Sequence, residues 1–172
     1  MSERRVDAFK QAIKMEQDGK SFYEQSAGKA VSILAKRVFQ DLARAEDKHI
    51  TKLTQIYKSL KETGKWPDVA LNRKASETIP NIFSTALKAI DERAKGNTTD
   101  IDALKMAAGL ENEGIKFYQA KSEEAQDSFQ RKFFMLLARE ESEHFITLLD
   151  SVEYLEDPQG YFSQLERGTM SF

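Results

Sequence analysis

The stretch LARAEDKH at residues 42–49 returns as LAREESEH at residues 137–144. The chain has two histidines, and each of them ends one of these stretches. A shift of 95 positions, from His49 to His144, also aligns the flanking sequence without a gap. The sequence therefore predicts a molecule with an internal two-fold repeat. Pairs that the repeat matches are Ala8/Ala103, Glu16/Glu111, Gly19/Gly114, Tyr23/Tyr118, Phe39/Phe134, Arg44/Arg139, Glu46/Glu141 and Leu53/Leu148.

Both copies read as pairs of helices. Proline occurs only at positions 67, 80 and 158, and apolar residues recur every three or four positions between them. Gly28 separates the first two helices, the pattern from Thr99 to Asp102 resembles a capping box, and Asp127 or Ser128 can cap the last helix. The pattern predicts helices at about 3–27, 31–60 and 100–124, and a fourth helix that follows its cap and runs to about 156.

The connection between the two copies determines the expected architecture. It is far longer than a tight helical turn, and it contains a further short predicted helix at about 81–96. Such a connection can cross the length of a bundle, because about 30 helical residues span about 45 Å. We therefore expect an all-α, ferritin-like four-helix bundle with a long crossover. The expected single domain spans 1–172, with repeat halves at about 3–60 and 98–156, a crossover at 61–97 and a C-terminal tail at 157–172.

The repeated stretches carry a pattern suited to metal binding. Glu46 and His49 are three residues apart, as are Glu141 and His144, so each pair lies on one face of a helix.

Glu16 and its repeat mate Glu111 supply matching acids on the other two long helices. Helical phase places Glu16 on the apolar side with Phe9, Ala12 and Tyr23, where an acid is costly unless it is paired or bound to metal.

These six side chains match the di-iron or di-manganese site of four-helix bundles. Four carboxylates neutralise two divalent ions and can bridge them, while imidazole favours iron, manganese or zinc over calcium. The predicted metal ligands are Glu16, Glu46, His49, Glu111, Glu141 and His144.

Several nearby residues have weaker patterns. Tyr23 and Tyr118 follow the acids by two helical turns, and either hydrogen-bond to ligand carboxylates or serve as core aromatics. Glu140 and Glu143 have a different phase from Glu141 and are expected on a solvated face. Surface or interface positions are expected for Arg44 and Arg139, and packing positions for Phe22, Phe39, Trp66, Phe117, Phe133 and Phe134.

Composition excludes other classes of function. The chain has no cysteine, so disulfides, thiol nucleophiles and cysteine-bound clusters are absent from it. Its net charge is −2 with mixed signs, and it has no basic patch of the kind that binds nucleic acid. It shows neither a signal peptide nor a membrane span, so we expect a soluble cytoplasmic protein.

The motifs MEQDGKSFY and LENEGIKFY, each followed by LARAEDKH or LAREESEH, resemble the rubrerythrin group of ferritin-like proteins over about residues 5–156. The chain is most similar to short forms that carry only the di-iron bundle, whose tail resembles EYLEDPQGYFSQLE. The resemblance implies two iron ions on the six ligands and reduction of hydrogen peroxide. It also implies electrons from an external donor, a rubredoxin-like protein or a flavoprotein, because the rubredoxin module is absent.

The sequence departs from the family at one position and from a related family at others. Rubrerythrins carry a further Glu one turn after the third helix's ligand, where this chain has Gly114. Glu113 does not replace it, because it points about 200° around the helix from Glu111. Bacterioferritins have the same six ligand types but place a haem-binding Met where this chain has Asp47 and Ser142, so no haem is expected.

Three functions follow as hypotheses. The first is a di-iron oxidoreductase acting on hydrogen peroxide or O2 in protection from oxidative stress, and the second is a ferroxidase that sequesters iron. The third is a bundle with a vestigial site that acts through protein contacts. A homodimer is expected because two-fold dimers are the commonest oligomers, and a domain-swapped dimer remains an alternative.

Overall fold

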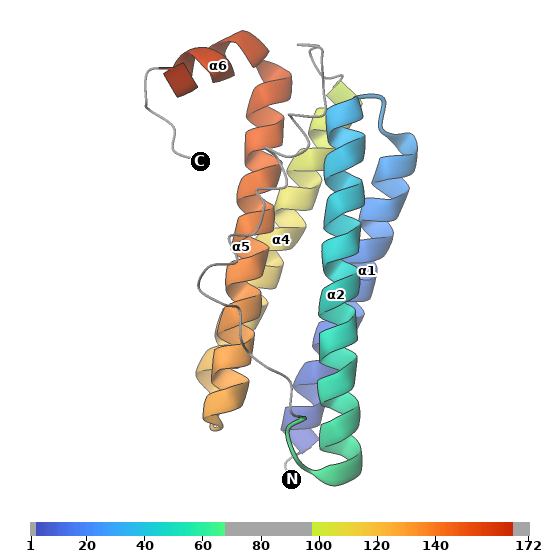
Figure 1. The fold of residues 1–172 in the computed structure, drawn as a ribbon, viewed down its shortest axis with the longest axis vertical. Coiled ribbons are helices and arrows are strands. Elements are labelled where there is room, and N and C mark those ends of the chain that lie inside the picture. Colours follow the sequence, from blue (N-terminus) through green and yellow to red (C-terminus); the bar gives the residue numbers. More distant parts are fainter. Residues whose placement is uncertain (1–2, 68–97, 167–172) are drawn as a thin grey trace.

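The computed structural model describes residues 3–67 and 98–166. Four long helices lie side by side, and a short helix turns away from the end of the last one (Figure 1). The fold is an all-α, ferritin-like four-helix bundle, as predicted. The helices are α1 (Glu3–Lys29), α2 (Ile33–Thr63), α4 (Thr98–Glu124), α5 (Ser128–Glu156) and α6 (Pro158–Glu166).

The helices form two antiparallel hairpins, α1–α2 and α4–α5 (Figure 1). Helix α2 ends at one end of the bundle and α4 begins at the opposite end, so the chain between them connects the two ends. This is the predicted crossover, and the further helix expected at 81–96 lies outside the described residues. The assignment of 1–172 to one domain stays a prediction. In the described ranges, no helix is long and apolar enough to cross a membrane.

The helix ends follow local chemistry. The Asp127 carboxylate caps α5 by accepting hydrogen bonds from the backbone N–H groups of Phe129 (2.9 Å) and Gln130 (3.0 Å). Gly64 ends α2 with φ of 69°, a left-handed conformation that glycine adopts without strain. Helix α1 continues past the predicted break at Gly28 to Lys29.

The predicted capping box at Thr99 is wrong. Helix α4 begins at Thr98, so Thr99 already lies within its first turn. The next residue, Asp100, is buried and accepts hydrogen bonds from the backbone of the α1–α2 connection, at Ser32 N (2.6 Å) and Val31 N (3.2 Å). Asp100 therefore binds the backbone of the α1–α2 connection and also places a negative charge near the N-terminus of α4, where the helix dipole favours it.

The hydrophobic core has two parts. One cluster, around Phe39 and Leu104, packs toward the α6 end, and the other, around Phe9 and Phe134, packs toward the opposite end. Trp66 packs against the second cluster as expected, and the ring centroids of Trp66 and Phe9 lie 5.9 Å apart. The predicted core aromatics Phe39, Phe133 and Phe134 are buried, while Phe22 and Phe117 pack against the clusters from partly buried positions.

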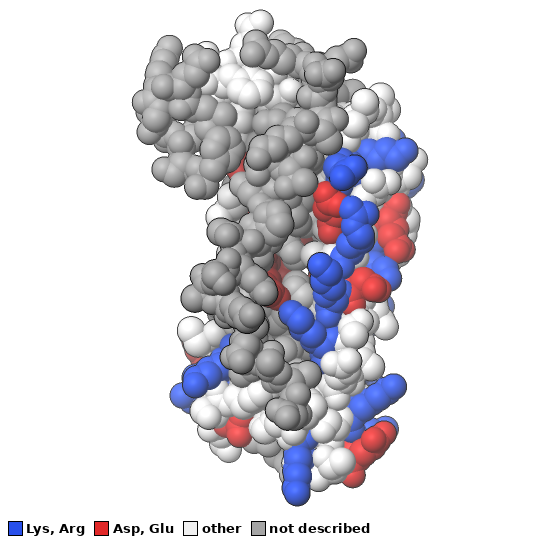
Figure 2. Space-filling model, in the orientation of Figure 1, with Lys and Arg blue, Asp and Glu red and all other residues white. Residues whose placement is uncertain are grey.

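The outer side of α2 is charged. Figure 2 shows that the visible side of α2 carries a row of Lys and Arg with acidic side chains beside them. An ion pair between Lys20 and Asp47 (2.5 Å) joins α1 to α2 across this surface. Arg44 and Arg139 have side chains that are 62% and 60% exposed, as expected for surface positions.

Residues 158–166 of the predicted tail form α6, which packs back on α5. Its contact is aromatic, because the Tyr154 ring on α5 meets Tyr161 at 5.9 Å and Phe162 at 5.8 Å. These rings extend the first hydrophobic cluster beyond the end of the four-helix bundle.

Candidate metal centre

Six acids and imidazoles meet between the two hydrophobic clusters, and each is at most 5% exposed. Each of the four long helices contributes at least one of them. The internal repeat places equivalent residues at the same level along the two hairpins. They are the six predicted ligands: Glu16 from α1, Glu46 and His49 from α2, Glu111 from α4, and Glu141 and His144 from α5.

One ligand group surrounds His49. Its Nδ1 lies 3.2 Å from Glu141 Oε1, 3.3 Å from Glu46 Oε2 and 3.6 Å from Glu16 Oε2. One ligand atom from each of these four residues falls within 4.8 Å of the others, so a single ion could contact all four.

A second group surrounds His144 with nearly the same geometry. Its Nδ1 lies 3.3 Å from Glu46 Oε1, 3.3 Å from Glu141 Oε2 and 3.6 Å from Glu111 Oε1. Glu46 and Glu141 belong to both groups, each with one oxygen turned toward each histidine. Two carboxylates shared in this way can bridge two metal ions.

The donor atoms fit cations. Among the described residues, both Glu46 oxygens, Glu141 Oε1 and the Nδ1 atoms of His49 and His144 are buried without a hydrogen bond. Buried polar atoms of this kind carry a large desolvation cost unless something compensates it. Two divalent ions would satisfy these atoms and neutralise the carboxylates at the same time.

The two predicted tyrosines hold the outer carboxylates. The Tyr23 hydroxyl on α1 donates to Glu111 Oε1 on α4, and the Tyr118 hydroxyl donates to Glu16 Oε1 in the opposite direction. Burial and the neighbouring carboxylates raise the pKa of both hydroxyls well above the usual value, so they remain protonated donors. Their rings also pack in the core, 6.2 Å from Phe39 and 5.9 Å from Phe134, so both interpretations of these residues hold.

Without metal, the cluster keeps protons. Burial raises the pKa of Glu16 and Glu111 well above the usual carboxyl range. Burial alone would also raise the pKa of Glu46, but Glu16 and the two imidazoles lower it to about 2. The pKa of His49 and His144 is raised well above its usual value, because the surrounding carboxylates outweigh burial.

Glu140 corrects the sequence-based expectation of a solvated face. Its side chain is buried and its Oε2 lies 2.9 Å from His49 Nε2. Helix α5 packs against both α4 and α2. The side of α5 that carries Glu140 therefore faces α2 instead of solvent. Glu143 remains 38% exposed, close to the expectation.

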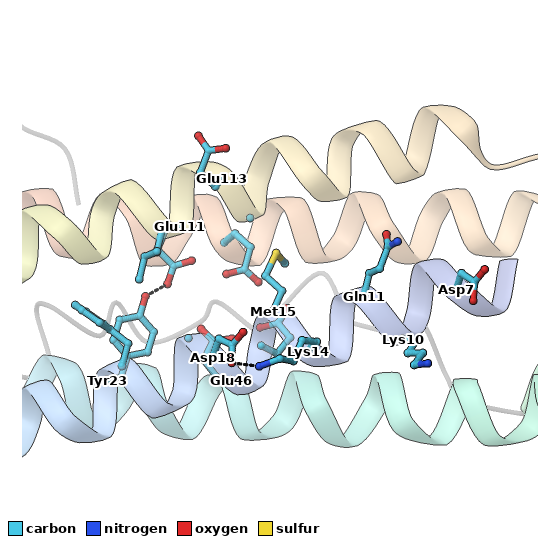
Figure 3. A pocket seen from close by; sticks show the side chains of 16 residues that line it. Asp7, Lys10, Gln11, Lys14, Met15, Asp18, Tyr23, Glu46, Glu111 and Glu113 are labelled. Carbon is cyan, nitrogen blue, oxygen red and sulfur yellow. Dashed lines mark hydrogen bonds and ion pairs between the residues drawn. The ribbon is translucent and has the colours of Figure 1, made fainter. Parts of the chain in front are cut away.

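A groove of about 890 Å³ between α1 and α4 reaches the carboxylates. Figure 3 shows Tyr23 reaching across it to Glu111, with Met15 and Glu46 beside them. Gly19 and its repeat mate Gly114 also line the groove. A Cβ at Gly114 would lie 3.5 Å from Glu141 Cγ, an ordinary contact distance, so a side chain there would enter the groove beside the cluster.

The comparison with known families agrees with this centre. The family model described as Rubrerythrin matches residues 7–101, which is more than half of the chain. The match includes Glu16, Glu46 and His49, while the other three ligands follow from the internal repeat. No curated protein and no solved structure gives a significant match.

Proposed function

Because the chain belongs to the rubrerythrin family, we propose that it is a di-iron oxidoreductase that reduces hydrogen peroxide or O2. The observation that carries the proposal is the pair of four-residue ligand groups that share Glu46 and Glu141. Zinc or manganese would fit the same donors, so the choice of iron rests on the family.

Each residue of the centre has a distinct part in this proposal. Glu16, Glu46, His49 and Glu141 would hold one iron, and Glu46, Glu111, Glu141 and His144 the other. Two ferrous ions bound there would supply two electrons, the number needed to convert hydrogen peroxide and two protons to two molecules of water, or O2 and two protons to hydrogen peroxide. Four carboxylates balance the charge of these ions, so the buried centre carries little net charge.

The surrounding residues orient the ligands and admit the oxidant. Tyr23 and Tyr118 hold Glu111 and Glu16 from across the bundle. The groove between α1 and α4 gives a small molecule a path to the carboxylates between two hydrophobic clusters.

We also propose that turnover depends on partners and on assembly. The chain has no cysteine, so the electrons would come from a separate rubredoxin-like protein or flavoprotein. A homodimer in the cytoplasm is the simplest setting. Exposed apolar side chains on the α4–α5 hairpin support a dimer, and they are Met106, Leu110, Met135, Ile146 and Leu149. Light scattering of the purified protein tests this assembly.

Anaerobic titration with Fe(II) tests the central proposal. We expect two irons per chain in the wild type and none in the Glu46→Ala/His49→Ala variant. Rapid mixing of the loaded protein with hydrogen peroxide or O2 then identifies the oxidant, and catalytic turnover should require an added reductant.

Two results would redirect the proposal. Retention of many more than two irons per chain in a large particle would support iron sequestration. Absence of Fe(II), Mn(II) and Zn(II) binding in the wild type would contradict a metal centre and leave a bundle that acts through protein contacts.

A further inference from the structure

The two ligand groups are nearly equivalent around their metal-facing atoms. The distances from His49 Nδ1 to its three carboxylates are 3.2, 3.3 and 3.6 Å, against 3.3, 3.3 and 3.6 Å for His144. The two tyrosine hydrogen bonds are related by the same symmetry. A difference between the two metal positions can therefore come from residues that surround the ligands.

Glu140 is such a residue. It lies on α5, its Oε2 is 2.9 Å from His49 Nε2, and its side chain is 10% exposed. Its other oxygen, Oε1, lies 3.9 Å from Lys52 Nζ on α2. His49 therefore presents Nδ1 to the cluster while its opposite nitrogen faces a carboxylate.

The internal repeat does not reproduce this contact. The shift of 95 that relates His49 to His144 relates position 45 to Glu140, and position 45 is Ala45. The same shift relates Lys52 to Thr147. The repeat therefore makes Ala45 the α2 counterpart of Glu140, and its methyl group cannot accept a hydrogen bond from the imidazole of His144.

We propose that Glu140 is a positioning residue that makes the His49 metal position the tighter of the two. A carboxylate that accepts the Nε2 proton fixes the imidazole tautomer and ring orientation and makes Nδ1 a stronger donor. Removal of such a partner typically lowers metal affinity by about 10–100-fold. The inference rests on the proposed two-metal centre, and it adds an order of filling that the ligands alone do not specify.

Titration of the metal-free protein with Co(II) under anaerobic conditions tests the order. Absorption of the bound ion and competition with a chelator report the two binding constants. We expect two steps in the wild type separated by about 10–100-fold, with the tighter step assigned to the His49 position.

Three single variants identify the cause. Glu140→Gln, which keeps the side-chain size, should weaken the first step and bring the two steps together. Ala45→Glu should strengthen the second step by supplying an acid behind His144. Glu143→Gln removes a more exposed acid from the same helix and should leave both steps unchanged.

Several outcomes would overturn the inference. Two unchanged steps in Glu140→Gln would exclude the positioning role, and an equal loss in both steps would indicate a general charge effect. If Glu140→Gln does not fold, an unchanged second step in Ala45→Glu would still contradict the inference. If the wild type binds no metal, both the two-metal centre and the role of Glu140 are contradicted. If the wild type binds two ions but the variants leave both binding constants unchanged, only the role of Glu140 is contradicted.

Discussion

At the scale of single residues, the ligands depend on groups that do not face the metal positions. Tyr118 holds Glu16, Tyr23 holds Glu111, and Glu140 lies against His49. A hydrogen bond from a buried phenol limits the rotation of a carboxylate that would otherwise turn freely in the groove. The geometry of the centre is therefore largely preorganised by the protein.

Tyr118→Phe should destabilise the metal-free protein by about 1–3 kcal/mol, because it leaves the buried Glu16 oxygen without its donor. Tyr23→Phe should have a similar effect through Glu111. Urea unfolding measures both. Tyr57→Phe is the control, because Tyr57 is only partly buried, and it should cost less than about 0.5 kcal/mol. Equal stability of wild type and Tyr118→Phe would contradict a structural role for the hydrogen bond.

Metal binding should release protons and tighten as the pH rises. The pKa values of Glu16, Glu111, His49 and His144 are raised, so these groups keep protons that a metal ion must displace. Calorimetric titration with Mn(II) in two buffers of different ionisation enthalpy counts the released protons. An affinity that does not change between pH 6 and pH 8, without proton release, would show that the metal-free cluster is already deprotonated.

At the scale of the elements, one carboxylate fastens one hairpin to the other. Asp100, in the first turn of α4, accepts backbone hydrogen bonds from Val31 and Ser32 at the connection between α1 and α2. Ser32 in turn caps α2 by accepting from Ala35 N (3.4 Å). The start of α2 and the start of α4 are thereby held together at one end of the bundle.

Asp100→Ala should destabilise the protein by about 1–3 kcal/mol, because two partly buried N–H groups lose their acceptor. Hydrogen exchange should accelerate at the amides of Val31 and Ser32 more than in the middle of α5. Asp102→Ala is the matched control, because Asp102 is exposed on the same helix. Slow exchange at Val31 and Ser32 in the variant would show that another group holds this connection.

At the scale of the whole molecule, the centre interrupts the core. A layer of acids and imidazoles separates two hydrophobic clusters, where apolar residues would give a more stable metal-free bundle. The protein therefore gives up stability in the metal-free state, and bound metal should restore it.

Glu16→Gln/Glu111→Gln should raise the metal-free melting temperature at pH 7. Burial raises the pKa of both acids in the folded protein. As the pH rises above the unfolded value of 4.5, the acids ionise in the unfolded chain before they ionise in the folded protein, which lowers the free energy of unfolding. Glutamine cannot ionise, so the variant avoids this loss. Each kcal/mol gained corresponds to about 2–4 °C for a chain of this size. The gain should vanish near pH 4.

The same variant should lose stabilisation by metal. In the wild type, free Mn(II) at about 1,000 times its dissociation constant should add about 4 kcal/mol per site. Calorimetric scans with and without Mn(II) measure both effects. A variant that is less stable than the wild type without metal would contradict the cost assigned to these buried acids.

The sequence by itself determined the four long helices, the crossover and the six candidate ligands. Helical periodicity and the repeat of 95 positions are properties of the linear chain, and a pattern written twice places equivalent residues symmetrically once the hairpins pack. Which metal these residues bind stays a prediction.

Only the tertiary structure decided which groups support the ligands. Sequence spacing left Tyr23 and Tyr118 between two roles, and the structure shows their hydrogen bonds to Glu111 and Glu16. It predicted a solvated Glu140, which instead lies against His49. It also predicted a helix cap at Thr99, whereas the neighbouring Asp100 accepts hydrogen bonds from the α1–α2 connection. Each of these contacts joins different helices, and its presence depends on how the helices are rotated and spaced relative to one another. Periodicity within one helix specifies which side is buried, but it does not specify which atom of a neighbouring helix a buried polar group meets.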